Sequence, residues 1–328
     1  MHILQLLPRL EVGGVERGVV DLARGLIAAG DRVTVVSAGG RLVEPLQRLG
    51  ARHVTLSVDD KSPAAVWRSL PVMCRLIRQQ PIDVVHARSR VPAWIGYLAA
   101  RRTGRPFVTT CHGFYRSHPL SRVMGWGRTV IVPSGAVGRY MIDCFGVLPE
   151  RLRVIPRGVD LDEFALRPRT PHASGAPWRI GLIGRITALK GHAIALQALH
   201  QLRRRGVPAT LSVIGDASED QSKLRDELID LARRLDVEDA VEWLGTRGDI
   251  PQILASLDVV VAPSVYPESF GRSLIEAQAV GVPVVASDLG AFPELVHDGA
   301  TGLLVPPNDP TRVAGAVARL LGDAALRQ

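Results

Sequence analysis

The chain has 328 residues, of which 46% are hydrophobic and 22% are charged. This length exceeds the size at which one hydrophobic core keeps growing, so we expect two domains, and the ordinary composition excludes disordered, collagen-like and disulfide-scaffold proteins. The formal net charge of +8 is uneven, because residues 1–165 hold 23 Lys and Arg against 13 Asp and Glu, whereas residues 166–328 hold 17 against 19.

The basic first half suits an anionic partner such as a membrane surface, but an arginine-rich composition explains the excess equally well. The cysteines, Cys74, Cys111 and Cys144, form no CxxC pair, which argues against a disulfide framework or a zinc site and favours a reducing compartment. The opening MHILQLLPRL is interrupted too early for a signal peptide, and no apolar run approaches the roughly 18 residues of a membrane span. We therefore expect a cytoplasmic protein whose only membrane contact is peripheral.

Short β-branched or Leu-rich runs recur along the chain, each followed by a longer segment with helical spacing, which predicts βαβ units and parallel sheets in an α/β fold. In the first half these runs are His2–Leu7, Arg32–Ser37, Ile82–His86, Phe107–Thr110 and Thr129–Val132. In the second half they are Arg179–Gly184, Thr210–Gly215, Val241–Leu244, Val259–Ala262, Pro283–Ala286 and Gly302–Val305.

Residues 167–178 are rich in Pro, Gly and small polar residues, which predicts a linker between a first domain at 1–166 and a second domain at 179–328. Two doubly wound domains in succession predict a ligand in a central cleft between them, because open parallel sheets bind ligands at the carboxyl ends of their strands.

In the first domain, Gly13 and Gly14 follow a predicted strand and open directly into a helix. Adjacent glycines let an anion approach the backbone N–H groups of a helix start, although the turn lacks GxGxxG spacing and such turns are often only structural. His86 and Arg88 end another predicted strand, and binding of an acceptor or a phosphate and a structural role both remain open for them.

In the second domain, Arg185 and Lys190 lie between a predicted strand and a helix, where two cations could clamp a diphosphate or simply be solvated. Glu268 and Glu276 follow within Pro-Glu-Ser-Phe-Gly and the next helix. Carboxylates accept hydrogen bonds from vicinal hydroxyls, which suits a sugar ring and a ribose. By spacing alone, two surface carboxylates would explain the pair as well.

The combination of Gly13-Gly14, His112-Gly113, Arg185…Lys190 and Glu268…Glu276 resembles the retaining glycosyltransferases of family 4, which have the GT-B fold of two Rossmann-like domains facing a cleft. Two stretches, VVHARSRVPAWIGYLAARRTGRPFVTTCHGFY and RVIPRGVDLDEF, are similar to those of bacterial enzymes that build lipopolysaccharide core or related surface polysaccharide.

The resemblance implies a donor site whose residues are grouped by the part of the nucleotide sugar that they contact. They are Gly13, Gly14, Arg185 and Lys190 for the diphosphate; His112, Glu268, Ser269, Phe270 and Gly271 for the transferred sugar; Glu276 for the ribose; and Gly215 and Gly245 beside the nucleobase. Among them, His112, Glu268, Arg185 and Lys190 are expected to be catalytic, with a buried structural histidine as the alternative for His112.

The expected reaction is retaining transfer of a hexose from a nucleotide diphosphate sugar, with uridine diphosphate as the preferred nucleotide, without a metal or cofactor. The expected acceptor is lipopolysaccharide core, a glycolipid or a polysaccharide at the inner face of the cytoplasmic membrane, and no nucleic-acid partner is expected. A sugar-nucleotide 2-epimerase and a non-catalytic nucleotide- or polyanion-binding module are the alternatives. The sequence departs from the family at Arg157, where many relatives carry Asn, in a short segment at 118–127, and in a terminal helix expected to be short or incomplete.

Overall fold

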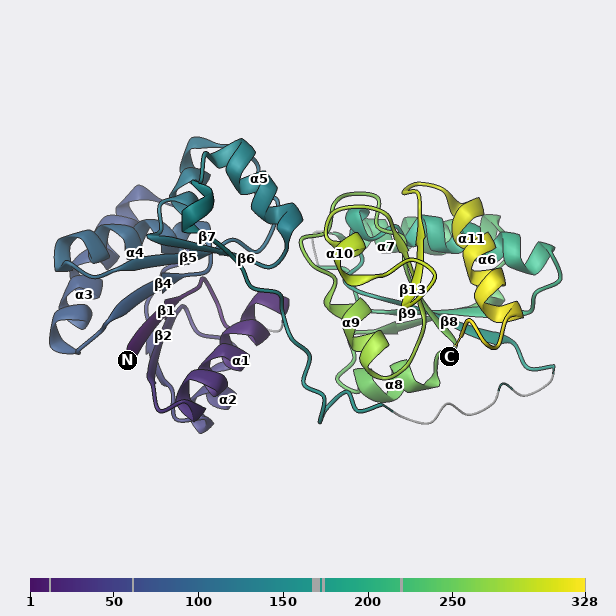
Figure 1. Cartoon of the computed structure of the whole chain (residues 1–328), viewed down its shortest axis with the longest axis horizontal. Coiled ribbons are helices and arrows are strands. Elements are labelled where there is room, and N and C mark those ends of the chain that lie inside the picture. The colour runs from purple at the N-terminus through teal and green to yellow at the C-terminus, as the bar shows by residue number, and fades with distance from the viewer. Residues whose placement is uncertain (12, 61, 167–171, 173–174, 219–220, 328) are drawn as a thin grey trace. The chain divides into compact units, whose positions relative to one another are not determined.

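The computed structural model describes residues 1–328 except 12, 61, 167–171, 173–174, 219–220 and 328. The chain forms two compact units, Met1–Arg157 and Gly158–Gln328, and each is described by itself (Figure 1). The division precedes the predicted linker, because Phe164 is already fully buried in the core of the second unit. Most of the predicted linker lies outside the described residues, so its position stays a prediction.

Unit 1, the segment Met1–Arg157, is built on a parallel seven-stranded sheet with the order β3-β2-β1-β4-β5-β6-β7. Its strands are β1 (His2–Leu6), β2 (Arg32–Ser37), β3 (Arg52–Thr55), β4 (Val84–Ala87), β5 (Phe107–Thr110), β6 (Thr129–Val132) and β7 (Leu152–Val154). Its helices are α1 (Gly14–Ala28), α2 (Val43–Arg48), α3 (Pro63–Gln79), α4 (Arg90–Thr103), α5 (Gly135–Phe145) and the 3₁₀ turns η1 (Pro119–Gly125) and η2 (Pro149–Arg151).

Helices cover both faces of this sheet, as the alternation along β2 shows. Val33 and Val35 pack with buried residues of α1 and α2, whereas Val36 belongs to the larger cluster formed with α3, α4 and α5. Figure 1 shows α1 and α2 on one side of the strands and α3 and α4 on the other. This is the doubly wound arrangement that the strand–helix alternation predicted.

The sequence analysis missed β3 and β7, which are the two edge strands of this sheet. Both are short, and each carries arginine: β3 reads Arg-His-Val-Thr and β7 reads Leu-Arg-Val. An edge strand buries little surface and is commonly charged, so it leaves no apolar run in the sequence to identify it.

Unit 2, the segment Gly158–Gln328, repeats the plan with a parallel six-stranded sheet of order β10-β9-β8-β11-β12-β13. Its strands are β8 (Trp178–Ile183), β9 (Ala209–Ile214), β10 (Val241–Gly245), β11 (Val259–Ala262), β12 (Val284–Ser287) and β13 (Gly302–Val305). Its helices are α6 (His192–Arg204), α7 (Ser222–Arg234), α8 (Ile250–Ser256), α9 (Arg272–Ala279), α10 (Phe292–Leu295), α11 (Pro310–Gly322) and the turns η3 (Ala188–Lys190) and η5 (Glu238–Ala240).

All six predicted strands of unit 2 occur, with each end within one residue of its prediction. One face of the sheet packs against α6, α7 and α11, and the other against α8, α9 and α10 (Figure 1). The long helices begin where local chemistry favours them: the Asp309 carboxylate accepts from the Arg312 N–H at the start of α11, with Pro310 in the first position. Among the described residues, no helix is both long and apolar enough to cross a bilayer.

Candidate functional site

In unit 2 the predicted donor residues Arg185, Lys190 and Glu268 follow β8 and β11, two strands that are hydrogen-bonded neighbours in the middle of the sheet. The chain order of the strands reverses between these two, so the loops at their carboxyl ends diverge and leave room for a ligand. The loop after β8 carries Arg185 and Lys190, and the loop after β11 carries Glu268.

The structure brings Lys190 and Glu268 together. The Lys190 Nζ lies 2.8 Å from Glu268 Oε1, and the Ser264 hydroxyl donates to the same carboxylate oxygen at 3.0 Å. The two loops are also joined through the backbone, because the Val265 N–H donates to the Leu189 carbonyl at 2.9 Å. A cation and a carboxylate from distant parts of the chain are therefore held side by side.

Two glycines make this packing possible. Gly184 has a φ of +156°, and a Cβ there would lie 3.0 Å from the Lys190 Cε, so the lysine chain runs directly over the glycine. Gly215 has a φ of +131°, and a Cβ there would lie 2.2 Å from the Gly184 carbonyl oxygen. Gly215 also donates its N–H to the Gly245 carbonyl at 2.8 Å. Gly215 and Gly245, which were predicted to lie beside the nucleobase, are thus explained by the packing of the backbone. Their role in nucleobase binding stays a prediction.

Glu276 and Arg185 have different surroundings. Glu276 is buried at 7% exposure in the second turn of α9, and the Arg272 Nε donates to its carboxylate at 2.7 Å. Arg185 is exposed, and the described residues give its side chain no ion pair. Roles of Glu276 on a ribose and of Arg185 on a diphosphate stay predictions.

The segment Ser269–Gly271 leads into α9. Phe270 is buried and anchors the loop, and Gly271 stands at the N-cap of the helix without a side-chain cap. A Cβ on Gly271 would lie 2.9 Å from the Phe292 ring, so the backbone there is packed closely. A helix start of this kind leaves backbone N–H groups available to an oxygen ligand.

In unit 1 the predicted residues Gly14 and His112 are joined by an arginine. Arg157 Nη1 donates to the Gly14 carbonyl at 2.6 Å, and Arg157 Nη2 contacts the His112 Nδ1 at 2.9 Å. Arginine can only donate, so the His112 Nδ1 must accept, and the ring is neutral with its proton on Nε2. The His112 Nε2 is buried and has no hydrogen-bond partner among the described residues.

The surroundings hold His112 in this neutral form. Its pKa lies well below the ordinary value of 6.5, first because the ring is buried and then because Arg88, Arg157 and His86 repel an added proton. His112 is therefore unsuited to hold a second proton, but it is a hydrogen-bond donor fixed in place. His112 has a structural partner in Arg157, as expected if it is a structural histidine. It also keeps one N–H that no described residue uses.

Two further histidines are buried and kept neutral. His86 bonds Thr110 through Nε2 and Oγ1 at 2.7 Å, and burial followed by repulsion from Arg88 lowers its pKa to about 3. His192 begins α6 directly after the Lys190 loop, and burial with repulsion from Lys190 lowers its pKa to about 4. The sequence analysis left the role of Arg157 open and did not single out His192. The arginine in place of the relatives' asparagine was the one signal available for Arg157.

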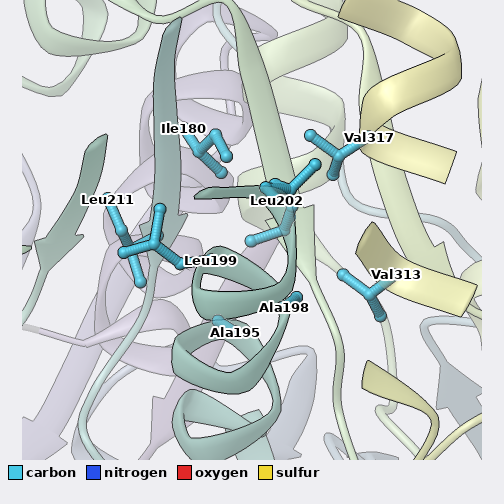
Figure 2. Close-up of a pocket in the computed structure, with 9 residues that line it drawn as sticks. Ile180, Ala195, Ala198, Leu199, Leu202, Leu211, Val313 and Val317 are labelled. Carbon is cyan, nitrogen blue, oxygen red and sulfur yellow. The ribbon is translucent and has the colours of Figure 1, made fainter. Parts of the chain in front are cut away.

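One internal void of unit 2 is too small and too apolar to be a substrate site. A void of about 10 Å³ lies between α6, α11 and the strands beneath them, and its lining is entirely apolar (Figure 2). Apolar voids of this size stay dry and record imperfect packing. Within the described part of the chain, no group of three His, Cys, Asp or Glu residues is placed to hold a metal ion. Metal independence of any reaction stays a prediction.

Comparison with known proteins identifies the class. The model of Glycosyltransferase Family 4 matches residues 12–163, and that of Glycosyl transferases group 1 matches residues 177–323. A D-inositol 3-phosphate glycosyltransferase of Frankia alni is 32% identical over 356 residues, covering 95% of this chain and 86% of its own length.

Solved structures agree with these matches. A glycosyltransferase from Rickettsia africae is similar with a TM-score of 0.89 and 28% identity, covering 99% of this chain and 90% of that one. Anabaena HepE, solved with UDP and glucose, has a TM-score of 0.84 and 25% identity, covering 99% of this chain and 91% of that one. The fold is thus GT-B, and the class is that of glycosyltransferases that use a nucleotide-sugar donor. The chain belongs to family 4 of these enzymes.

Proposed function

We propose that this enzyme transfers a hexosyl group from a UDP-sugar to a hydroxyl of an acceptor, with retention of anomeric configuration and without a metal ion. The contact between Lys190 and Glu268 is the observation that carries the proposal. It places a cation suited to the donor diphosphate beside a carboxylate suited to the hydroxyls of the transferred sugar.

The Lys190–Glu268 pair is suited to exchange partners when a donor binds. Both side chains are partly exposed, at 28% and 19%, and an ion pair of this kind contributes about 1 kcal/mol or less. A diphosphate offers Lys190 a greater negative charge, which frees the Glu268 carboxylate for sugar hydroxyls. The UDP and glucose in HepE support a uridine nucleotide and a hexose.

The proposed mechanism relies on fixed charges and dipoles. As the bond to the leaving diphosphate breaks, negative charge grows on the diphosphate, and the ammonium of Lys190 and the guanidinium of Arg185 stabilise it. The main chain of His112 contacts a hydroxyl of the sugar. Glu276 holds the ribose hydroxyls, and the backbone N–H groups of Ser269–Gly271 meet the sugar.

Two acceptor types are proposed. The stretches at 84–115 and 153–164 resemble enzymes of lipopolysaccharide core or surface polysaccharide synthesis, whereas the named relatives act on D-inositol 3-phosphate according to their names. Residues 1–165 carry an excess of ten positive charges, 23 against 13, which supports peripheral contact with anionic lipid at the inner face of the cytoplasmic membrane.

The test measures release of nucleotide diphosphate from UDP-glucose, UDP-galactose and GDP-mannose, with D-inositol 3-phosphate or a lipopolysaccharide-core acceptor. The variant Lys190→Met should bind UDP about 10- to 150-fold more weakly, because a hydrogen bond to a charged group contributes about 1.5–3 kcal/mol. Lys223→Met is the matched control, since that lysine is 90% exposed on α7.

Each alternative gives a different result. Unimpaired UDP binding by Lys190→Met would contradict the diphosphate clamp. Conversion of a sugar nucleotide with no acceptor present would indicate a 2-epimerase, and inversion at the transferred carbon would contradict retention. Loss of activity in EDTA, restored by Mg²⁺, would contradict metal independence.

A further inference from the structure

Arg88 is a buried charge that the described residues leave without a counter-ion. It follows β4 and is 7% exposed, and its Nη1 donates to the Gln5 side-chain oxygen at 3.2 Å. Its buried Nε has no hydrogen-bond partner among the residues that the structure describes. Within the described part of the chain, no carboxylate lies at ion-pair distance from its guanidinium. A charged group removed from water without a partner is costly, and such groups concentrate where a ligand completes the arrangement.

A second guanidinium lies nearby rather than a carboxylate. Repulsion from Arg157 is the next cause after burial that lowers the pKa of Arg88, to about 10. Glu16 and Asp21 act in the opposite direction with smaller effect, as does Tyr115. Arg157 is held in place by the Gly14 carbonyl and by His112. A Cβ on Gly14 would lie 3.2 Å from Arg157 Nη1, and a Cβ on Gly18, one turn further along α1, would lie 3.2 Å from Arg88 Nη2, so the protein keeps two like charges over the first turns of α1.

His112 adds a third donor to this group. Its pKa responds to both Arg88 and Arg157, so all three side chains share one region. Its Nδ1 accepts from Arg157, and the buried Nε2–H has no partner in the described part of the chain. We call Arg88, Arg157 and His112 the arginine cluster. All three members lie in unit 1.

We propose that the arginine cluster binds an oxyanion carried by the acceptor, a phosphate or a carboxylate. The proposal rests on the function proposed above and specifies its substrate class: an acceptor with an anionic group close to the hydroxyl that receives the sugar. A guanidinium presents parallel N–H groups that match two oxygens of either anion.

The acceptor accounts for this cluster better than the donor does. The cations proposed for the donor diphosphate, Arg185 and Lys190, belong to unit 2, and the anion of the donor is already matched there. Both proposed acceptor types are anionic, since D-inositol 3-phosphate carries a phosphate and lipopolysaccharide core carries acidic groups. An oxyanion on the acceptor is thus a common feature that one cluster can recognise.

The experiment titrates inorganic phosphate into the full-length protein by calorimetry, at constant ionic strength and with saturating UDP so that the donor site is filled. Arg88→Gln should weaken phosphate binding about tenfold or more, because a charged hydrogen bond is lost. Arg153→Gln is the control, since that arginine of unit 1 is exposed and bonds only backbone carbonyls of its own strand region. Equal phosphate affinity in wild type and Arg88→Gln would overturn the proposal.

A second variant and a second measurement test the proposal even if Arg88→Gln fails to fold. Arg157→Gln keeps a polar side chain but removes the charge, and it too should weaken phosphate binding while Arg153→Gln does not. In the transfer assay, kcat/KM should favour D-inositol 3-phosphate over myo-inositol and glucuronate over glucose, and Arg88→Gln should reduce the preference. Wild-type preference for the neutral acceptors would overturn the proposal. If UDP itself fails to bind wild type, the proposed function fails instead.

Discussion

Buried neutral histidines make unit 1 sensitive to acid, and His86 allows the effect to be calculated. In the folded state its pKa is about 3, whereas an unfolded histidine has a pKa near 6.5. Below pH 6.5 the unfolded chain takes up a proton at this position and the folded chain does not. Folding stability is therefore complete above pH 6.5 and declines as the pH falls toward 3.

The size of the effect follows from these two pKa values. At pH 5 the unfolded state gains about 2 kcal/mol from protonation at this position, while folded His86 gains almost nothing. We expect the free energy of unfolding of unit 1 to fall from pH 7 to pH 5 by about 2 kcal/mol more in wild type than in His86→Gln. Glutamine does not titrate and can still bond the Thr110 hydroxyl.

Urea unfolding at the two pH values measures this difference. Every protein compared carries Trp178→Phe and Trp243→Phe, so that tryptophan fluorescence reports on unit 1 alone. A loss in the free energy of unfolding that His86→Gln causes equally at both pH values cancels, because only the change between pH 7 and pH 5 is compared. The control His118→Gln, at an exposed histidine of unit 1, should keep the wild-type change. Equal pH dependence in wild type and His86→Gln would refute the reasoning.

Two packing predictions concern unit 2. Gly191 has a φ of +70°, and a Cβ there would lie 1.9 Å from the Pro263 carbonyl oxygen, so Gly191→Ala should cost well over about 1 kcal/mol and weaken UDP binding. Gly206→Ala has a similar φ of +78° but open space, so a lower urea midpoint in Gly191→Ala than in Gly206→Ala is the expected result. Leu199, 1% exposed, lines the void in Figure 2, and Leu199→Ala should destabilise unit 2 by about 2–5 kcal/mol. Exposed Leu161→Ala should change stability little, and an equal loss in both variants would contradict this account.

The fold could be predicted from sequence wherever a strand is buried on both faces. The run Val259–Ala262 lies in the interior of its sheet, and its observed bounds match the prediction. Interior strands of a parallel sheet need continuous apolar residues, which leave a clear pattern. The edge strands β3 and β7 do not need continuous apolar residues, so the hydrophobic pattern did not predict them.

The site could be predicted only as separate residues. The resemblance identified Lys190, Glu268 and His112 as members of a donor site, but it assigned no partner to any of them. The Lys190–Glu268 contact and the bond from Arg157 to His112 were not visible in the sequence, because each joins loops that follow different strands.

What the sequence determined by itself was local: the periodicity that forms strands and helices, the glycines that permit tight turns, and the family to which the motifs belong. What only the tertiary structure decided was which polar groups meet. The strand order places the carboxyl end of β1 beside that of β4, and the carboxyl end of β8 beside that of β11. Residues far apart in the chain therefore lie close together in each unit, where burial and neighbouring charges act on them jointly. Burial in unit 1 keeps His112 neutral and leaves Arg88 charged with no counter-ion among the described residues, and neither property belongs to any residue alone.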